Sequence, residues 1–245
     1  MSRTLVIGDI HGGLRALEQV LERAGVTNYD KLIFLGDYVD GWSESSAVIT
    51  YLLKLATRQT CVFIKGNHDA FCEEWLRTGN GNSSWQTNGG LETVKSYEGL
   101  GETVRRAHLE LLQQMPFYYL DDENRLFIHA GFTSMRGPQK EFQSPVFSWD
   151  RTLWETALAL DPMMEKNSSF YPRRLRLFKE IYIGHSPTLR YQKMVPMQAA
   201  NVWNMDTGAA YEGKLSIMDV ETKEFWQSDN LPQLYPTEQG RKFNQ

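Results

Sequence analysis

The sequence predicts an α/β fold in which short parallel strands alternate with helices. Apolar residues recur at helical spacing over about 13–25 and 44–57, and Ser43 is the expected cap of the second helix. This strand–helix–strand–helix–strand order implies parallel strands joined by right-handed crossovers. Five β-rich apolar runs, each closed by a glycine or a polar residue, are typical of buried strands and lie at 5–7, 32–35, 62–64, 126–128 and 181–183.

The segment from about 70 to 116 predicts a helical insertion. Its loop at 78–84 is rich in Gly, Asn and Ser, so it either covers a site or forms a solvated connection. Asn88 lies near the start of a helix, where it either caps that helix or lines a substrate entrance. Helices are expected at 71–77, 90–97 and 102–115.

The C-terminal part of the chain returns to strands after one more expected helix at about 150–160. Strands are expected at 202–206, 214–220 and 224–226. We expect a single domain over 1–230. Residues 231–245 are expected to form a tail that is a surface coil, because Pro and Gly interrupt it.

Composition and charge exclude several classes of protein. The 245 residues include 26 Lys plus Arg and 30 Asp plus Glu, and the net charge of −4 argues against stable binding to nucleic acid or to an anionic membrane. The chain does not begin with a secretory signal, and no run approaches the ~20 apolar residues that span a bilayer. Cys61 and Cys72 form no CxxC pair, so we expect reduced, unreactive thiols in a soluble cytoplasmic protein.

Oxygen and imidazole donors follow the predicted strands, at the edge where α/β sheets bind their ligands. Carboxylate and imidazole ligands without thiolate are typical of sites that bind Mn, Fe or Zn, whereas a structural zinc site would be expected to contain cysteine. Six donors are more than one tetrahedral ion binds, whereas two ions that share a bridging carboxylate would account for all six. Glycines before four of the donors are expected to allow tight turns. The six donors are Asp9, His11, Asp37, Asn67, His129 and His185.

Five motifs mark the strand ends: GDIHG (8–12), GDYVDG (36–41), GNHD (66–69), IHAG (128–131) and GHSP (184–187). In this order and spacing they resemble the calcineurin-like metallophosphoesterases. Within that superfamily they resemble the phosphoprotein phosphatase branch, with its small bacterial and phage serine/threonine phosphatases and its dinucleoside tetraphosphatases. The resemblance extends over about 5–220 and implies a two-sheet β-sandwich flanked by helices, in four αββα layers.

The resemblance implies a role for each donor. Asp9, His11 and Asp37 would hold the first of two divalent ions, and Asp37 would bridge to the second. The second site would be completed by Asn67, His129 and His185. Manganese is the expected metal, with iron, zinc and cobalt as alternatives. A hydroxide that bridges the two ions would attack phosphorus directly, without a phosphoenzyme.

The same resemblance implies roles for residues that handle the substrate. His68 would be the general acid that protonates the leaving oxygen, and Asp40 would hold His68 in the right orientation. Arg151, in a Trp-x-Arg stretch, would bind the substrate phosphate together with Asn67.

The sequence departs from the family pattern directly after GDYVD. Phosphatases of this branch continue with Arg-Gly, and that arginine binds the substrate phosphate, whereas this chain has Gly41-Trp42. A glycine does not replace a bidentate guanidinium. Candidate substitutes are Arg77, Arg173 and Arg174, and nothing in the sequence selects among them.

Several other residues have both a structural and a functional interpretation. Trp42 and Trp85 either stack on a nucleobase or pack in the core. The basic stretch 173–176 is expected to be a solvated face, with recruitment of phosphate as the alternative. His108 is expected on the exposed side of a charged helix.

Three functions remain open from the sequence. The main expectation is a dimetal-dependent phosphomonoesterase of the serine/threonine phosphatase type, which acts on a phosphorylated protein, a peptide or a small phosphoester. The alternative is hydrolysis of dinucleoside polyphosphates or nucleotides, which the missing arginine and Trp42 favour. The third is a non-catalytic scaffold, against which the complete ligand set argues. Nothing in the sequence selects an oligomeric state.

Overall fold

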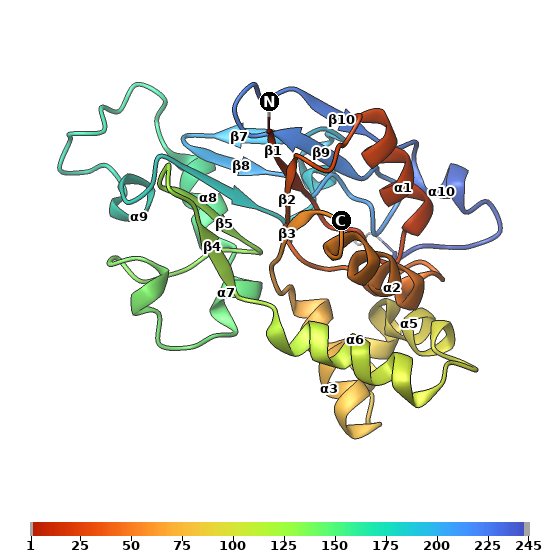
Figure 1. Ribbon diagram of the computed structural model, residues 1–245. Coiled ribbons are helices and arrows are strands. Elements are labelled where there is room, and N and C mark those ends of the chain that lie inside the picture. The colour runs from red at the N-terminus through yellow and green to blue at the C-terminus, as the bar shows by residue number, and fades with distance from the viewer. Residues whose placement is uncertain (1, 243–245) are drawn as a thin grey trace.

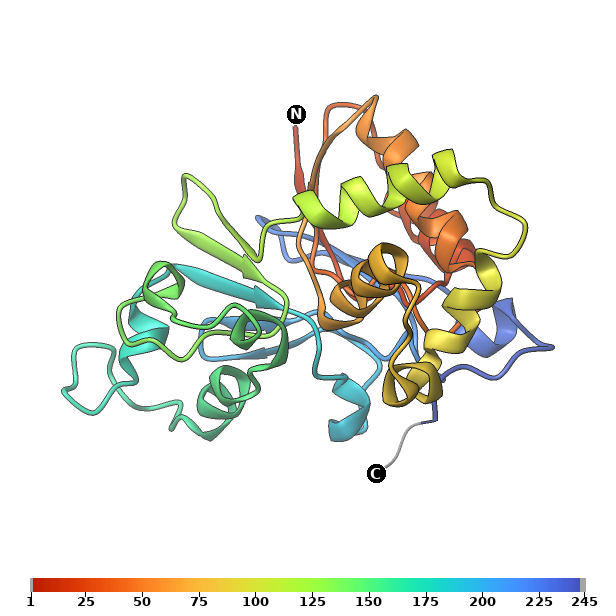
Figure 2. The ribbon, with the colours of Figure 1, turned by 90° about the horizontal axis from the view of Figure 1, so that it is seen from below.

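Two mixed sheets of five strands each pack face to face between two layers of helices (Figure 1, Figure 2). The structure is a computed structural model that describes residues 2–242. In spatial order, the first sheet contains β10 (Phe225–Gln227), β9 (Ser216–Asp219), β1 (Thr4–Ile7), β2 (Lys31–Phe34) and β3 (Thr60–Phe63). The second sheet contains β4 (Tyr118–Leu120), β5 (Arg125–Ile128), β6 (Glu180–Ile183), β8 (Val202–Asn204) and β7 (Met197–Ala199). The predicted αββα sandwich is confirmed.

All five apolar runs form strands, and the parallel pairing expected of them is present in both sheets. In the first sheet β1, β2 and β3 are parallel, so that Leu5 pairs with Leu32 and Leu32 with Cys61. In the second sheet β5, β6 and β8 are parallel. Antiparallel strands flank each parallel set. Of these, β4 and β7 were not predicted, because a three-residue strand carries too little pattern.

Helices α1 (Leu14–Arg23) and α2 (Ser45–Ala56) cover the outer face of the first sheet (Figure 1). Each buries one apolar stripe against the strands, as the helical spacing predicts. The expected cap of α2 is wrong. The Ser43 hydroxyl donates to Glu238 Oε1 at 2.8 Å instead, and no side chain caps the helix.

The helical insertion extends this layer. It consists of α3 (Asn67–Thr78), α4 (Ser83–Trp85), a π-helical turn (Gln86–Gly90), α5 (Leu91–Ser96) and α6 (Glu102–Gln114). Helix α3 packs against α6, and α5 packs against α2. Because α3 begins at Asn67, just after β3 ends, the first turn of the insertion belongs to the strand-end edge.

Shorter helices cover the second sheet on the opposite side (Figure 2). They are α7 (Val146–Trp149), α8 (Thr152–Ala159) and α9 (Arg173–Arg176), with 3₁₀ turns at Pro138–Lys140 and Thr188–Tyr191. Trp154 of α8 is fully buried among the side chains of this sheet. Within residues 2–242, none of the helices has the length and apolar character needed to cross a membrane.

A third apolar layer joins the two sheets through their inner faces. Phe127 and Tyr182 stack there with ring centroids 4.9 Å apart. The layer is completed by Val6, Ile33, Leu35, Ile64, Met205, Met218 and Val220. This packing fixes one sheet against the other, and so fixes the relative positions of the loops that follow their strands.

One arginine of the basic stretch 173–176 is buried rather than solvated. Arg174 is buried and donates to the Phe132 carbonyl at 2.6 Å and to the Thr152 hydroxyl at 3.0 Å, so a solvated face is wrong for this residue.

Burial raises the pKa of Cys61 to about 12 and raises that of the buried Cys72 well above its usual value. Protonated thiols are poor nucleophiles, which agrees with the expectation of unreactive cysteines.

The C-terminal tail is not a surface coil throughout. Helix α10 (Leu231–Leu234) buries Leu231, and Tyr235 stacks on Trp42 with ring centroids 5.1 Å apart. Trp42 and Trp85 are both buried, so both pack in the core and neither is available to stack on a nucleobase. Residues 243–245 of the expected tail lie outside the described residues.

His108 is buried, which contradicts the expectation of an exposed side chain. Its ring nitrogens lie 3.0 Å from Thr50 Oγ1 and 2.9 Å from the Tyr97 hydroxyl oxygen, so the ring joins α6 to α2 and to the residue after α5. The charged neighbours that suggested exposure lie on other faces of α6, because successive helical residues point in different directions.

The buried His108 predicts a specific loss of stability in acid. Burial lowers the pKa of His108 to about 4, whereas an unfolded histidine has a pKa of about 6.5. The neutral ring therefore contributes stability above pH 6.5 that is lost as the pH falls toward 4. We expect His108→Gln to unfold with a shallower dependence on pH than wild type in this range, measured by urea titration at each pH. Parallel dependences would contradict the assignment.

Candidate metal centre

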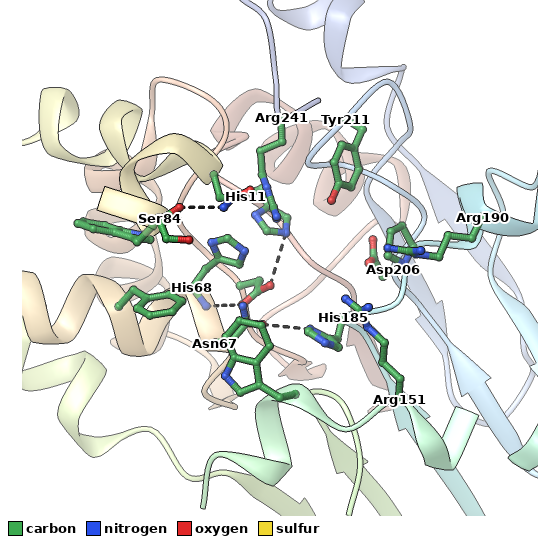
Figure 3. Close-up of a pocket in the computed structure, with 16 residues that line it drawn as sticks. His11, Asn67, His68, Ser84, Arg151, His185, Arg190, Asp206, Tyr211 and Arg241 are labelled. Carbon is green, nitrogen blue, oxygen red and sulfur yellow. Dashed lines mark hydrogen bonds and ion pairs between the residues drawn. The ribbon is translucent and has the colours of Figure 1, made fainter. Parts of the chain in front are cut away.

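The carboxyl ends of strands from both sheets bring the six predicted donors together at one edge. Asp9 and His11 follow β1, Asp37 follows β2, and Asn67 begins α3 after β3. From the second sheet, His129 follows β5 and His185 follows β6. All six side chains are buried, and the close-up of the pocket places His11, Asn67 and His185 around a common centre (Figure 3).

Asp37 lies at the middle of this cluster. Its Oδ2 atom is 3.6 Å from His11 Nε2 and 3.4 Å from His129 Nε2. Two groups of three side chains have ligand atoms within 4.8 Å of one another, and Asp37 is the member that they share. The groups are His11, Asp37 and His68, and Asp37, His129 and His185. A shared central carboxylate is the geometry that a bridging ligand requires.

Asp9 and Asn67 complete the surroundings of the cluster. Asp9 Oδ2 lies 4.0 Å from His11 Nε2 and accepts a hydrogen bond from the His185 backbone N–H at 3.0 Å. Asn67 Oδ1 lies 3.2 Å from His129 Nε2 and 3.0 Å from His185 Nδ1. Asn67 therefore presents oxygen to imidazole nitrogens that follow two other strands, and Asp9 faces the His11 imidazole and the His185 backbone.

Backbone carbonyls fix the tautomers of two imidazoles. His11 Nδ1 is 2.9 Å from the Asp40 carbonyl oxygen, and His129 Nδ1 is 2.8 Å from the Leu35 carbonyl oxygen. A carbonyl only accepts, so each Nδ1 carries a proton and each Nε2 is the ring nitrogen that faces the cluster. Outer hydrogen bonds of this kind orient metal-binding histidines.

Two buried polar atoms of the cluster have no hydrogen-bond partner among the residues that the structure describes. They are Asp9 Oδ1 and His185 Nε2. A buried acceptor left without a partner costs about 1–3 kcal/mol. Metal ions bound in the cluster would supply the positive partners that such acceptors lack, so the residues present fit a metal site.

Burial and neighbouring charges shift the pKa values of the carboxylates in the cluster. Burial raises the pKa of Asp9 well above its usual value, and the nearby Asp206 raises it further. Burial also acts to raise the pKa of Asp37, but the charges of the neighbouring histidines, His129 first, together with the hydrogen bond to His129, outweigh burial and hold it well below its usual range. Burial alone would lower the pKa of His129, whereas the carboxylates of Asp37 and Asp9 raise it to about 10. Several buried acids in contact are favourable when a cation balances them.

Burial favours the neutral form of the other two imidazoles. It lowers the pKa of His11 and of His185 well below the usual value. The neutral ring is the form that binds a metal, because protonation removes the lone pair.

The backbone is held in a sparsely populated conformation at four site residues. His11, Asp37, Asp40 and His185 have φ angles of 52°, 54°, 73° and 65°. Residues with side chains adopt this left-handed region at a cost, and such strain is common at functional sites. The packed sheets hold these turns in place, and the turns direct the side chains into the cluster.

Two glycines near the cluster leave room for the carboxylates of neighbouring residues. A Cβ atom added to Gly66 would overlap Asp37 Oδ1, and one added to Gly184 would overlap Asp9 Oδ1. Neither glycine has a positive φ. Glycine is therefore required at these two positions by the close approach of a carboxylate rather than by a positive φ.

Asp69 joins the loops that follow β2 and β3. Its carboxylate accepts hydrogen bonds from the backbone N–H groups of Asp37, Tyr38 and Gly66 at 2.8–2.9 Å. Burial, with the nearby Asp37 charge, raises the pKa of Asp69 to about 7. Asp69 thus positions the central carboxylate without facing the pocket.

His68 and Asp40 form a buried pair beside the cluster. His68 Nδ1 lies 2.6 Å from Asp40 Oδ2. Asp40 is itself held by the helical insertion, because Trp85 Nε1 donates to Oδ2 at 2.6 Å and the Thr93 hydroxyl donates to Oδ1 at 2.5 Å. The pair therefore leaves His68 Nε2 as the ring atom available to the cluster and fixes the ring plane.

A pocket of about 210 Å³ opens over the cluster. Arg151, the expected phosphate contact, lines it, and so does Asn88, for which a substrate entrance was one of two alternatives. Asn88 is not the cap of α5, because its Nδ2 donates to the Ser84 carbonyl at 2.8 Å. The proposed substitutes for the missing arginine do not line the pocket. They are Arg77, Arg173 and Arg174.

Other pocket residues were missed in the sequence. Asp206 follows β8 as the other donors follow their strands, so the same signal was present, although 202–206 was expected only as a strand. Trp149 is about half exposed at the rim, where its ring meets those of Phe71 and His185. Arg190 and Arg241 come from a 3₁₀ turn and from the C-terminal tail, and no local pattern marks either residue.

Two named proteins are similar to this chain over most of its length. A bis(5'-nucleosyl)-tetraphosphatase PrpE of Oceanobacillus iheyensis is 26% identical over 240 residues, which cover 90% of this chain and 89% of the relative. A protein of the same name from Bacillus cereus is 28% identical over 232 residues, covering 86% of this chain and 87% of the relative.

Solved structures show the same fold. A candidate diadenosine tetraphosphatase matches with a TM-score of 0.63 and 20% identity over 93% of each chain. A serine/threonine phosphatase of Saccharomyces cerevisiae, similar to human phosphatase PP5, matches with a TM-score of 0.58 and 15% identity, over 93% of this chain and 80% of that one. The family model described as calcineurin-like phosphoesterase matches residues 2–206. This chain therefore belongs to the calcineurin-like phosphoesterases, a family of hydrolases.

Proposed function

We propose that this protein hydrolyses dinucleoside polyphosphates with the help of two divalent metal ions. The observation that carries the proposal is one pocket in which three arginines surround the buried Asp/His cluster: Arg151, Arg190 and Arg241. A chain of phosphates carries several negative charges, so three guanidinium groups suit it better than they suit a single monoester. The relatives named as tetraphosphatases support this alternative over the serine/threonine phosphatase that was the main expectation.

The six buried donors would hold the metal ions. Asp9, His11 and Asp37 would bind one ion, and Asp37 would also bind the other. The second site would be completed by Asn67, His129 and His185. Divalent ions in such a site lower the pKa of water and neutralise charge on the phosphoryl oxygens. Manganese is our first choice, with iron, zinc or cobalt as alternatives, because oxygen and imidazole donors accept all four.

His68 would supply a proton to the departing phosphate or nucleotide oxygen. Its Nδ1 is occupied by Asp40 at 2.6 Å, so a proton on Nε2 faces the pocket. The bonds from Trp85 and Thr93 to Asp40 keep the ring from turning. Arg151 and Asn67 would contact the phosphate, since both line the pocket beside the cluster.

Trp149 would contact a nucleobase. The pocket volume of about 210 Å³ is smaller than the ~300–1,000 Å³ that buries most small ligands, so it suits the reacting phosphates and leaves a nucleoside at the rim. The Trp149 ring lies at that rim with 49% of the residue exposed. Its edge-on contacts to Phe71 and His185, at 6.0 Å and 5.8 Å between centroids, hold the ring in place.

A substrate panel tests the proposed function. We expect the manganese-loaded enzyme to hydrolyse diadenosine tetraphosphate with a kcat/KM at least about tenfold above that for a phosphoserine peptide. Trp149→Ala should lower the dinucleotide value by about 5- to 100-fold and leave p-nitrophenyl phosphate unchanged, because base stacking contributes about 1–3 kcal/mol. Phe142→Ala removes an exposed aromatic ring outside the pocket and is the control. Hydrolysis of the phosphopeptide alone would contradict the proposal.

A further inference from the structure

The C-terminal tail is fastened to the loop from which the family arginine is missing. Glu238 accepts hydrogen bonds from the Ser43 backbone N–H at 3.0 Å and from the Ser43 hydroxyl at 2.8 Å. Tyr235 stacks on Trp42 and donates its hydroxyl proton to Glu44. The tail thus binds three consecutive residues of the loop that follows GDYVDG.

The same contacts direct the next residues of the tail toward the pocket. Gly240 packs so closely on Trp42 that an added Cβ would lie 2.6 Å from the indole ring. The Arg241 backbone N–H then donates to the Ala210 carbonyl at 2.8 Å, which fixes the residue at the pocket wall. Figure 3 shows the Arg241 side chain extending from the C-terminal segment toward His11.

The Arg241 stem passes directly beside the position that lacks an arginine. A Cβ atom at Gly41 would lie 3.6 Å from Arg241 Cγ, and one at Gly89 would lie 3.1 Å from the same atom. Gly41 and Gly89 have φ angles of 119° and 101°, which side-chain-bearing residues rarely adopt. This backbone therefore disfavours an arginine at position 41 and leaves room for the arginine from the tail.

The guanidinium of Arg241 is placed to bind an anion. It lies over the Tyr211 ring, 5.4 Å from the centroid, in the pocket that His11 and Asp206 also line. Among residues 2–242, no carboxylate forms an ion pair with it. A guanidinium held in a pocket without a carboxylate partner keeps its donors available for phosphate oxygens.

We propose that Arg241 binds the phosphoryl group of the substrate beside the metal cluster, in place of the arginine that the motif lacks at Gly41. The inference rests on the proposed function only in that both require a phosphate in this pocket. Arg241 and Arg151 approach the cluster from different sides in Figure 3, so together they bracket the phosphate.

Binding of inorganic phosphate tests Arg241 without depending on the choice of substrate. We compare the manganese-loaded wild type with Arg241→Ala and Arg241→Gln, using calorimetry for phosphate and metal analysis for ion content. We expect a loss of phosphate affinity of at least about tenfold in both variants, with unchanged metal content, because a hydrogen bond to a charged group is removed. Lys242→Ala removes an exposed cation one residue further along, outside the pocket, and should bind phosphate as wild type does.

Phosphate affinity within twofold of wild type in a folded Arg241 variant would overturn the assignment, as would a wild type that does not bind phosphate. Gln keeps the length of the stem that packs at Gly89, so this variant serves if Arg241→Ala does not fold. If both variants lose phosphate affinity while the wild type fails to hydrolyse dinucleoside polyphosphates, the proposed substrate is wrong and the role of Arg241 stands.

Discussion

Asp37→Asn is expected to lose bound metal and to reduce hydrolysis by more than about 1,000-fold. Asp37 is the member shared by the two groups of potential ligands, and its negative charge helps to raise the pKa of His129. Asparagine has the same shape and retains the Oδ1 acceptor for the His68 backbone N–H, which is 3.0 Å away in wild type. The substitution therefore removes charge from the cluster with little change in packing.

Metal content and kcat, measured on the same preparation, check this prediction. Asp122→Asn is the matched control, because Asp122 is exposed and lies outside the pocket. We expect wild type and the control to bind two ions per chain and Asp37→Asn to bind at most one. Two ions and wild-type turnover in Asp37→Asn would show that the central carboxylate is not a bridging ligand.

His68→Asn is expected to lower kcat by about 100- to 10,000-fold, the usual contribution of a general acid. The asparagine side chain cannot donate a proton to the leaving oxygen, whereas the six proposed metal donors are unchanged. The loss should be greatest for a phosphoserine peptide, because its alkoxide leaving group is strongly basic. It should be smaller for p-nitrophenyl phosphate, because nitrophenolate leaves without a proton.

The comparison of leaving groups separates acid catalysis from damage to the metal cluster. Unchanged metal content, with a larger loss for the more basic leaving group, supports the proton-donor role. An equal loss for both substrates, or wild-type turnover in His68→Asn, would contradict it. His108→Gln, which alters a buried histidine outside the pocket, should keep the wild-type kcat.

The sequence predicted the part of the site that local pattern encodes. Each donor directly follows a short apolar strand, and parallel strands present their carboxyl ends at one edge, so Asp9, Asp37 and His129 could be placed together from pattern and topology. Asp206 obeyed the same rule after β8. It was overlooked because Asp-Thr-Gly is also a common turn sequence.

The rest of the site depends on contacts between distant segments. Trp85 donates to Asp40 from within the insertion, and Arg241 reaches the pocket wall from the end of the chain. No periodicity predicts such contacts, because they arise only when the sheets and helices have packed. Leu231 and Tyr235, four residues apart, were the available signal that the tail is anchored, and the Pro and Gly residues around them masked it.

Anomalous diffraction from crystals grown with manganese would show whether Asp37 lies between two metal ions. We expect two strong manganese peaks, one on the side of Asp37 nearest Asp9 and His11 and one on the side nearest His129 and His185. A single peak, or peaks away from Asp37, would contradict the two-ion site and the phosphate chemistry derived from it.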